Sequence, residues 1–152
     1  MAGKIVAREY LGMLWVTGRQ PHVDGPASAW LIRRFVDPAA TFAFAADLDE
    51  VLELGGTPFD RPAVELGRRD DRCAFESIML KHGLDDDALD ELAALVHDAE
   101  LDDGMYATAE APGLDAVMNG LRATHPDPAA YVAAAEPVFE GLYAWFTRLE
   151  EE

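Results

Sequence analysis

Cysteine is scarce in this chain, with Cys73 the one example among 152 residues. No disulfide can form within the chain, which fits the reducing environment of the cytosol. Long apolar runs are missing as well. Lys4, Arg8 and Glu9 interrupt the N-terminal stretch, and no run approaches the ~18 residues that span a membrane. We therefore expect a cytoplasmic protein without a signal peptide or membrane attachment.

Positive charge is the second shortage. Lys and Arg together number 12 against 29 Asp and Glu, which gives a formal net charge of −17. Binding to nucleic acids and to anionic membranes depends on Lys and Arg, so both partners are disfavoured. We expect a small-molecule or oxyanion ligand instead, while assembly with the same or another chain stays open.

Signature motifs of the large enzyme classes are a third absence. The sequence contains no Walker loop, no GxGxxG, no HExxH and no CxxC. Any chemistry must come from smaller groups of residues that lie apart in the sequence. No cofactor is indicated, although a divalent metal ion stays open.

Apolar periodicity and turn residues predict one α+β domain over 1–152, with a small sheet of about three strands packed against a helix-rich C-terminal part. Short apolar or alternating segments predict strands at 12–18, 41–45 and 62–67. Helical spacing and capping residues predict helices at 24–36, 47–56, 74–83, 85–100, 114–123 and 127–150.

Aspartate and proline mark several predicted helix ends. Asp24, Asp47 and Asp127 are each expected to cap the helix that they begin. Pro137 lies inside the last helix and is expected to kink or split it. The aromatic segment FEGLYAWF (139–146) of the same helix either packs in the core or docks a partner chain.

Arginines gather in one short stretch, at Arg61, Arg68, Arg69 and Arg72. The planar guanidinium binds tetrahedral oxyanions through paired hydrogen bonds, so these arginines are candidate oxyanion ligands. Alternatively, Asp70 and Asp71 neutralise them in a solvated loop. At least one of Arg33 and Arg34, in the helix at 24–36, must leave the core by reaching solvent or an acid, and Arg34 is a further oxyanion candidate.

A histidine and several carboxylates form a second group. The candidate catalytic residues are Asp24, Glu76 and His97, and the candidate metal ligands are His97, Asp98 and Glu76. On a regular helix His97 and Asp98 point apart, so both reach one ion only if the helix frays. The plain alternatives are an N-cap at Asp24, a first-turn charge at Glu76 and a half-buried His97 near a helix C-terminus. Cys73 is either activated by Arg72 or a small buried hydrophobe.

Several segments occur in a specific combination: WVTG at 15–18, VDGPASAWLIRRFVDP at 23–38, FD at 59–60, CAFE at 73–76, LAALVHDAELDD at 92–103 and AEAPGLDAV at 109–117. Together they resemble the C-terminal domain of the bacterial chromate-resistance family of the ChrB type. The resemblance implies a cytoplasmic protein linked to chromate resistance, as a regulator, a sensor or an accessory of the exporter.

The same resemblance exposes departures. Gly18 and Gly25 stand where the family pattern predicts arginines, and Arg68 stands where it predicts a histidine. Asp24 and His97 follow the pattern, as do Glu76 and Asp98. If the replaced residues form the family's oxyanion or metal site, this chain has lost or rebuilt that site.

Three functions are compatible with these features. The first is a chromate-resistance-type domain that handles a tetrahedral oxyanion or a small molecule bearing one. The second is a biosynthetic enzyme that eliminates sulfate from an amino sulfate to close an aziridine ring, because sulfate has nearly the shape of chromate. The third is a non-catalytic partner subunit.

Overall fold

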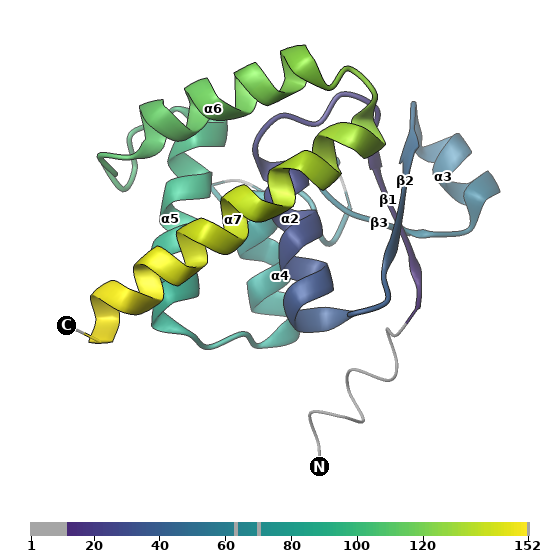
Figure 1. Cartoon of the computed structure of the whole chain (residues 1–152). Coiled ribbons are helices and arrows are strands. Elements are labelled where there is room, and N and C mark those ends of the chain that lie inside the picture. Colours follow the sequence, from purple (N-terminus) through teal and green to yellow (C-terminus); the bar gives the residue numbers. More distant parts are fainter. Residues whose placement is uncertain (1–11, 63, 70, 152) are drawn as a thin grey trace.

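The first part of the chain forms a small parallel sheet, seen on the right of Figure 1. The structure is a computed structural model that describes residues 12–62, 64–69 and 71–151. Its strands are β1 (Leu14–Gly18), β2 (Thr41–Ala45) and β3 (Thr57–Pro58), in the order β2-β1-β3. The predicted strands at 12–18 and 41–45 are confirmed. Residues 1–11, on which the argument against a signal peptide largely rests, lie outside the described ranges.

The predicted third strand at 62–67 is wrong, and Thr57–Pro58 takes its place beside β1. The described part of 62–67 turns back on itself: the Asp60 amide donates to Leu66 O, and the Gly67 amide donates to Val64 O. A Cβ on Gly67 would lie 1.9 Å from Arg61 O, so the chain doubles back closely there. The apolar content of 62–67 suggested a strand. Its described backbone groups instead form hydrogen bonds within a local turn, which satisfies them without a neighbouring strand.

The two connections between strands cover opposite faces of the sheet. The helix α2 (Asp24–Leu31) follows β1, and α3 (Leu48–Leu54) follows β2. Trp15 and other large side chains of the sheet join the main core, whereas Val16 and Ala45 pack in a small cluster with Val51 of α3. Since side chains alternate along a strand, this division follows from the order of residues within β1 and β2.

The predicted helix at 24–36 is continuous but changes its winding. After α2, a single π-helical segment, η1 (Ile32–Val36), carries the chain to Asp37. The buried Asp37 carboxylate then accepts hydrogen bonds from the amides of Gly12 and Met13 and from the Trp15 indole. This end of the helix is thereby tied to the start of β1.

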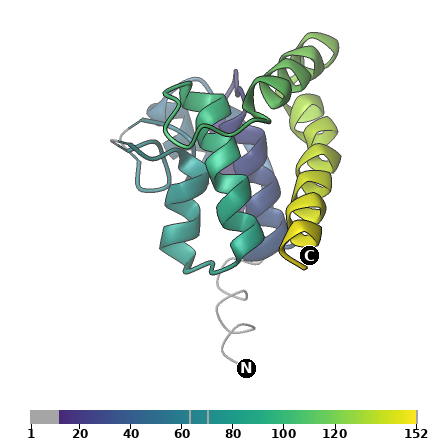
Figure 2. The same cartoon turned by 90° about the vertical axis from the view of Figure 1, so that its left-hand side faces the viewer.

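The rest of the chain is helical, as predicted. The elements are α4 (Ala74–His82), α5 (Asp87–Leu101), α6 (Ala111–Thr124) and α7 (Pro128–Glu151). In Figure 2 the helices α4, α5, α2 and α7 stand side by side, and α7 packs against both α2 and α5. None of the helices in the described part is long and apolar enough to cross a membrane.

Local signals at the helix ends had mixed success. Asp47 accepts from the Glu50 amide and Asp127 from the Ala130 amide, which confirms both caps. Pro137 does not split α7, which runs unbroken to Glu151. In the aromatic segment, Phe139 and Phe146 are buried while Trp145 is 46% exposed. Most of this segment's large apolar surface therefore serves the core.

Candidate functional site

Asp24 is wrongly predicted as the cap of its own helix, because it caps a different one. Its carboxylate is fully buried and accepts hydrogen bonds from the amides of Ala74 (2.6 Å) and Phe75 (2.9 Å), at the start of α4. The start of α2 is capped instead by Glu100, whose Oε1 accepts from the amides of Val23 and Asp24. These two carboxylates thus join three helices at their ends.

The carboxyl ends of the parallel strands collect further charged groups around Asp24. We call Asp24, Asp60, Glu100, Arg68 and His22 the strand-end cluster. Glu100 Oε2 lies 3.2 Å from Arg68 Nη2 and 3.3 Å from His22 Nδ1. The ends of parallel strands are the usual ligand position in open α/β sheets, because the helices on the two faces diverge there.

Two carboxyls of the strand-end cluster have raised pKa values. Burial raises the pKa of Asp24 to about 6, despite the opposing hydrogen bonds from Ala74 and Phe75. Burial, with the negative charges of Asp24 and Glu100, also raises the pKa of Asp60 well above its ordinary value. The Asp24 and Asp60 carboxyls are hydrogen-bonded to each other. Close carboxylates resist joint ionisation, so this arrangement favours a shared proton.

The positions where the family pattern predicts arginines border this cluster. A Cβ on Gly25 would lie 2.7 Å from Pro21 Cβ and 3.0 Å from Asp60 Oδ2, so a side chain there would displace its neighbours. A Cβ on Gly18 would meet only Arg61 Nη1, at 3.9 Å. The chain is closed around Gly25 and open at Gly18.

The structure does not bring the candidate arginines together. Arg61 donates to Ala45 O, and Arg68 pairs with Glu100. Arg34 lies instead against α7, where it pairs with Glu140 and stacks on Tyr143. The alternative that Asp70 neutralises these arginines stays a prediction, because Asp70 lies outside the described residues.

Arg69 and Arg72 are joined through their backbones, each amide donating to the other's carbonyl oxygen. Among the described residues, the Arg72 guanidinium has no hydrogen-bond or ion-pair partner. The Arg69 guanidinium also has no such partner in the described part of the chain, but of the two only Arg72 lines a groove.

Glu76 and His97 do come together, at the ends of α4 and α5. His97 Nδ1 lies 2.6 Å from Glu76 Oε1, and His97 Nε2 lies 2.9 Å from Asp103 Oδ2. The Tyr106 hydroxyl donates to Glu76 Oε2 at 3.1 Å, and its ring meets the imidazole edge to face. We call Glu76, His97, Asp103 and Tyr106 the groove cluster.

The two carboxylates control the charge of the histidine between them. Burial lowers the pKa of His97, but the hydrogen bonds and charges of Glu76 and Asp103 outweigh it, and the net shift is upward. Burial and the neighbouring Glu76 raise the pKa of Tyr106 to about 12. The cluster is therefore a carboxylate–imidazole–carboxylate chain with a neutral phenol at its outer end.

Asp98 has a structural task next to this chain. Its oxygens accept hydrogen bonds from the Tyr106 amide and from the amide and hydroxyl of Thr108, which hold the loop after α5. A ligand atom of Asp98 lies within 4.8 Å of those of His97 and Asp103. The expectation that His97 and Asp98 diverge is thus too strict, although Asp98 is already engaged by the loop.

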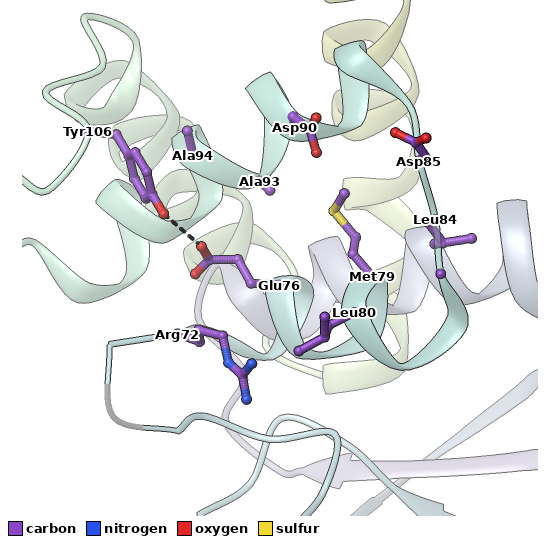
Figure 3. A pocket seen from close by; sticks show the side chains of 11 residues that line it. Arg72, Glu76, Met79, Leu80, Leu84, Asp85, Asp90, Ala93, Ala94 and Tyr106 are labelled. Carbon is purple, nitrogen blue, oxygen red and sulfur yellow. Dashed lines mark hydrogen bonds between the residues drawn. The ribbon is translucent and has the colours of Figure 1, made fainter.

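A groove between α4 and α5 borders the groove cluster. It has a volume of about 610 Å³ and is mainly apolar, with Met79, Leu80, Leu84, Ala93 and Ala94 among its walls. Figure 3 shows Glu76 and Tyr106 at one end of this α4–α5 groove, and Arg72 beside them with its guanidinium turned away from Glu76.

Sequence reasoning missed Asp60 and Tyr106. Asp60 directly follows β3, and the rule that parallel strands end at one edge could have placed it near Asp24 once that strand was found. Tyr106 lies in an irregular loop, and no sequence signal linked it to Glu76, thirty positions earlier in the chain.

Comparison with known proteins assigns the chain to a family. The family model described as "ChrB, C-terminal domain" matches residues 15–146, and the chain belongs to this family. A curated relative, Protein ChrB of Cupriavidus metallidurans, is 37% identical over 153 residues, covering 97% of this chain and 46% of the relative. The chain thus spans about half the length of that relative. No solved structure shows a significant match.

Proposed function

We propose that the α4–α5 groove binds a small organic molecule carrying a tetrahedral oxyanion and an amine, and that the chain promotes loss of the oxyanion, such as sulfate. The observation that carries this proposal is the end of the groove. There Arg72, whose guanidinium has no partner among the described residues, and the Glu76 carboxylate, which is backed by His97, both line the groove. A cation and an anion next to apolar walls suit an amphoteric organic ligand.

Size and charge both favour an organic ligand over a bare oxyanion. A volume of about 610 Å³ far exceeds the space that a single four-oxygen ion fills. The charged residues of the lining are Arg72 against Glu76, Asp85 and Asp90. A free dianion would be repelled by this excess of carboxylates. An amine on the same molecule turns that repulsion into attraction.

The chemistry would be an internal displacement. The ligand's nitrogen attacks the neighbouring carbon that bears the sulfate, a carbon–nitrogen bond forms, and the carbon–oxygen bond breaks. Sulfate leaves with the electron pair and is stabilised by Arg72. The proton released by the nitrogen passes to Glu76, whose Oε2 faces Tyr106 and the groove. A three-membered aziridine ring is the product when the two carbons are adjacent.

Chromate-resistance-type handling of a free oxyanion is the second candidate, and membership of the ChrB family supports it. The strand-end arginines would be its natural ligands. In this chain, however, Arg68 is held by Glu100 and Arg61 by Ala45 O. The binding experiment below therefore tests this second candidate function as well, through the affinity for free chromate.

Calorimetry on EDTA-treated protein tests the proposal, with sulfate, chromate and a vicinal amino-alkyl sulfate as ligands. We expect the amino-alkyl sulfate to bind at least ~10-fold more tightly than sulfate. Arg72→Met should weaken it by about 10- to 100-fold, the range for a lost charged hydrogen bond. The control Arg19→Met removes an exposed arginine paired with Glu50 and should leave binding unchanged.

Release of sulfate, followed by ion chromatography, tests the chemical step. Glu76→Gln should abolish release while keeping the fold, because glutamine can also serve in a capping box. Asp90→Asn removes one charge from the same groove and should retain release. Equal binding of free chromate would favour the second candidate, and unchanged binding in Arg72→Met would overturn the groove as the oxyanion site.

A further inference from the structure

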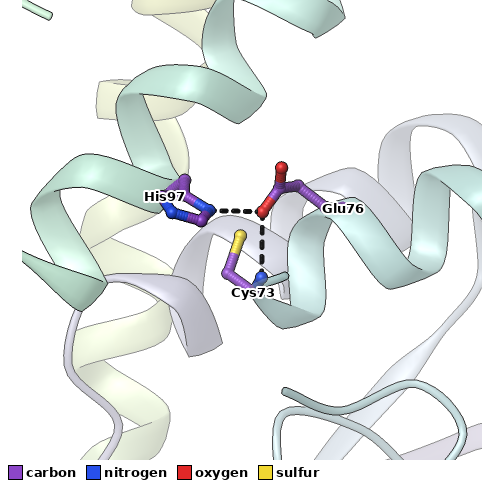
Figure 4. A group of neighbouring side chains, drawn as sticks. All are labelled: Cys73, Glu76 and His97. Carbon is purple, nitrogen blue, oxygen red and sulfur yellow. Dashed lines mark hydrogen bonds and ion pairs between the residues drawn. The ribbon is translucent and has the colours of Figure 1, made fainter. Parts of the chain in front are cut away.

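We propose that Cys73, Glu76 and His97 bind a divalent metal ion of the zinc class. Their ligating atoms all lie within 4.8 Å of one another. Cys73 and His97 are fully buried, and the Glu76 side chain is 15% exposed. Figure 4 shows the Cys73 sulfur directed toward the space between the imidazole and the carboxylate.

The types of donor atom match this class of ion. Zinc takes thiolate sulfur, imidazole nitrogen and carboxylate oxygen, at about 2.0–2.3 Å in tetrahedral geometry. Two such ligands lie about 3.3–3.7 Å apart around the ion, whereas His97 Nδ1 and Glu76 Oε1 are now 2.6 Å apart. Binding therefore asks these two side chains to part by roughly an ångström, which rotation about their side-chain bonds supplies.

The surroundings are those of a metal-binding histidine. His97 Nε2 is paired with Asp103, which leaves Nδ1 directed at the proposed ion. A carboxylate behind the second ring nitrogen orients the imidazole and strengthens it as a ligand. Glu76 has its second oxygen held by Tyr106, so both ligands are fixed from outside the site.

Cys73 itself is a second, independent indication. It occupies the N-cap position of α4, where serine, threonine, aspartate and asparagine are the favoured residues. Its amide donates to Glu76 Oε1, and its sulfur is the weak acceptor that faces the Glu76 amide in the same capping box. A thiol at a position that favours a hydroxyl is accounted for when the sulfur is a ligand.

The overlapping set His97, Asp98 and Asp103 is the weaker choice for the ion. Asp98 already accepts three hydrogen bonds that hold the following loop. Asp103 is partly exposed and accepts from the Met105 amide. Using these residues would cost loop structure, whereas the first set keeps it.

The metal site would add a positive charge to the proposed reaction in the α4–α5 groove. Only this link to the reaction rests on the proposed function, whereas the metal site itself does not. Glu76 and Tyr106 line the groove, while Cys73 and His97 lie behind them. The ion's fourth coordination position would then face the groove beside Arg72. A metal with an open position attracts an oxyanion and would supply the positive charge that the groove lining lacks.

Cobalt spectroscopy on metal-free protein tests the site without any organic ligand. We expect one Co²⁺ per chain, displaced by Zn²⁺, with a near-ultraviolet thiolate-to-cobalt band. Cys73→Ser should remove that band and weaken binding at least ~100-fold, the upper part of the range for lost outer-shell groups. Its melting temperature should be equal or higher, because serine is the better N-cap. His125→Gln, at an unrelated histidine, should change nothing.

Two results would overturn the metal site: no Co²⁺ or Zn²⁺ binding at micromolar concentration, or binding that persists without a thiolate band in Cys73→Ser. The second result would assign the ion to surface carboxylates. Failure here is separable from failure of the proposed function. The amino-alkyl sulfate titration is performed in EDTA, so ligand binding without metal binding would leave the groove proposal intact.

Discussion

The strand-end cluster and the groove cluster contain similar residues, but their carboxylates have different partners. Each holds several carboxylates around a histidine, and each contains residues that the ChrB resemblance singles out. In the first, Asp24 and Glu100 accept from four backbone amides at the starts of α4 and α2. In the second, Glu76 and Asp103 each accept from one backbone amide, and their other contacts are with the side chains of His97 and Tyr106 beside an apolar groove.

This difference separates structure from chemistry. Carboxylates consumed by helix amides cannot be released to a ligand without unfolding helix ends. Carboxylates that meet side chains can exchange those partners for a substrate or an ion. Closure around Gly25 strengthens the contrast, since a longer residue there would intrude on Asp60. We therefore expect the groove cluster, which gives up fewer carboxylate oxygens to backbone amides, to exchange partners with a ligand more readily than the strand-end cluster does.

The largest difference in stability is expected between alanine substitutions of one carboxylate from each cluster, Asp24→Ala and Asp103→Ala. Asp24→Ala leaves the Ala74 and Phe75 amides without their acceptor in a fully buried place. We expect a loss of ~3–5 kcal/mol in the free energy of unfolding, about 1–3 kcal/mol for each orphaned group. Asp103→Ala, at a side chain 38% exposed, should lower the free energy of unfolding far less, because exposed ion pairs contribute little to stability. Urea unfolding measures both, and equal losses would contradict the division.

The raised pKa values of Asp24 and Asp60 predict a pH dependence for the stability of the strand-end cluster. Both pKa values are raised on folding, so the folded chain binds more protons than the unfolded chain above pH ~4. The free energy of unfolding should therefore fall as pH rises through about 6. For Asp24 alone the fall is on the order of 2–3 kcal/mol.

Asp60→Asn is the matched variant for this pH effect. Asn tolerates the positive φ of 50° at this position, and its amide can donate to an ionised Asp24. Stability should then change less between pH 5 and 8 than in the parent chain, a range that brackets the raised pKa of Asp24 at about 6. Urea unfolding at several pH values gives the slope, and an undiminished slope would place the titration elsewhere.

Alanine substitutions at the two glycines are expected to show the smallest effect of the three. In Gly25→Ala the new methyl group would meet Pro21 Cβ at 2.7 Å. Relief of that overlap should cost ~1–3 kcal/mol in the free energy of unfolding. Gly18→Ala meets only Arg61 Nη1 at 3.9 Å and should stay within ~0.5 kcal/mol of the parent. Thermal unfolding of the pair compares them, and similar values would mean that the strand-end cluster is not closed.

Local patterns predicted most of the fold. Alternation gave β2, helical spacing gave the helices from α4 to α7, and Asp47 and Asp127 cap their own helices as their positions predict. Such signals depend on neighbours within one or two turns. The third strand failed because PAVELG at 62–67 has strand-like composition, while its described backbone groups bond back to Asp60 and to one another.

The sequence by itself determined the acidic charge, the helical layers and the family, and it named Glu76 and His97 as candidates. Only the tertiary structure decided what each carboxylate does. Asp24 bonds to amides fifty positions away, and His97 is placed between Glu76 and Asp103 by the packing of α4 against α5. A carboxylate looks the same in the sequence whether it caps a helix or faces a groove. Its role depends on which donors the folded chain brings within about 3 Å.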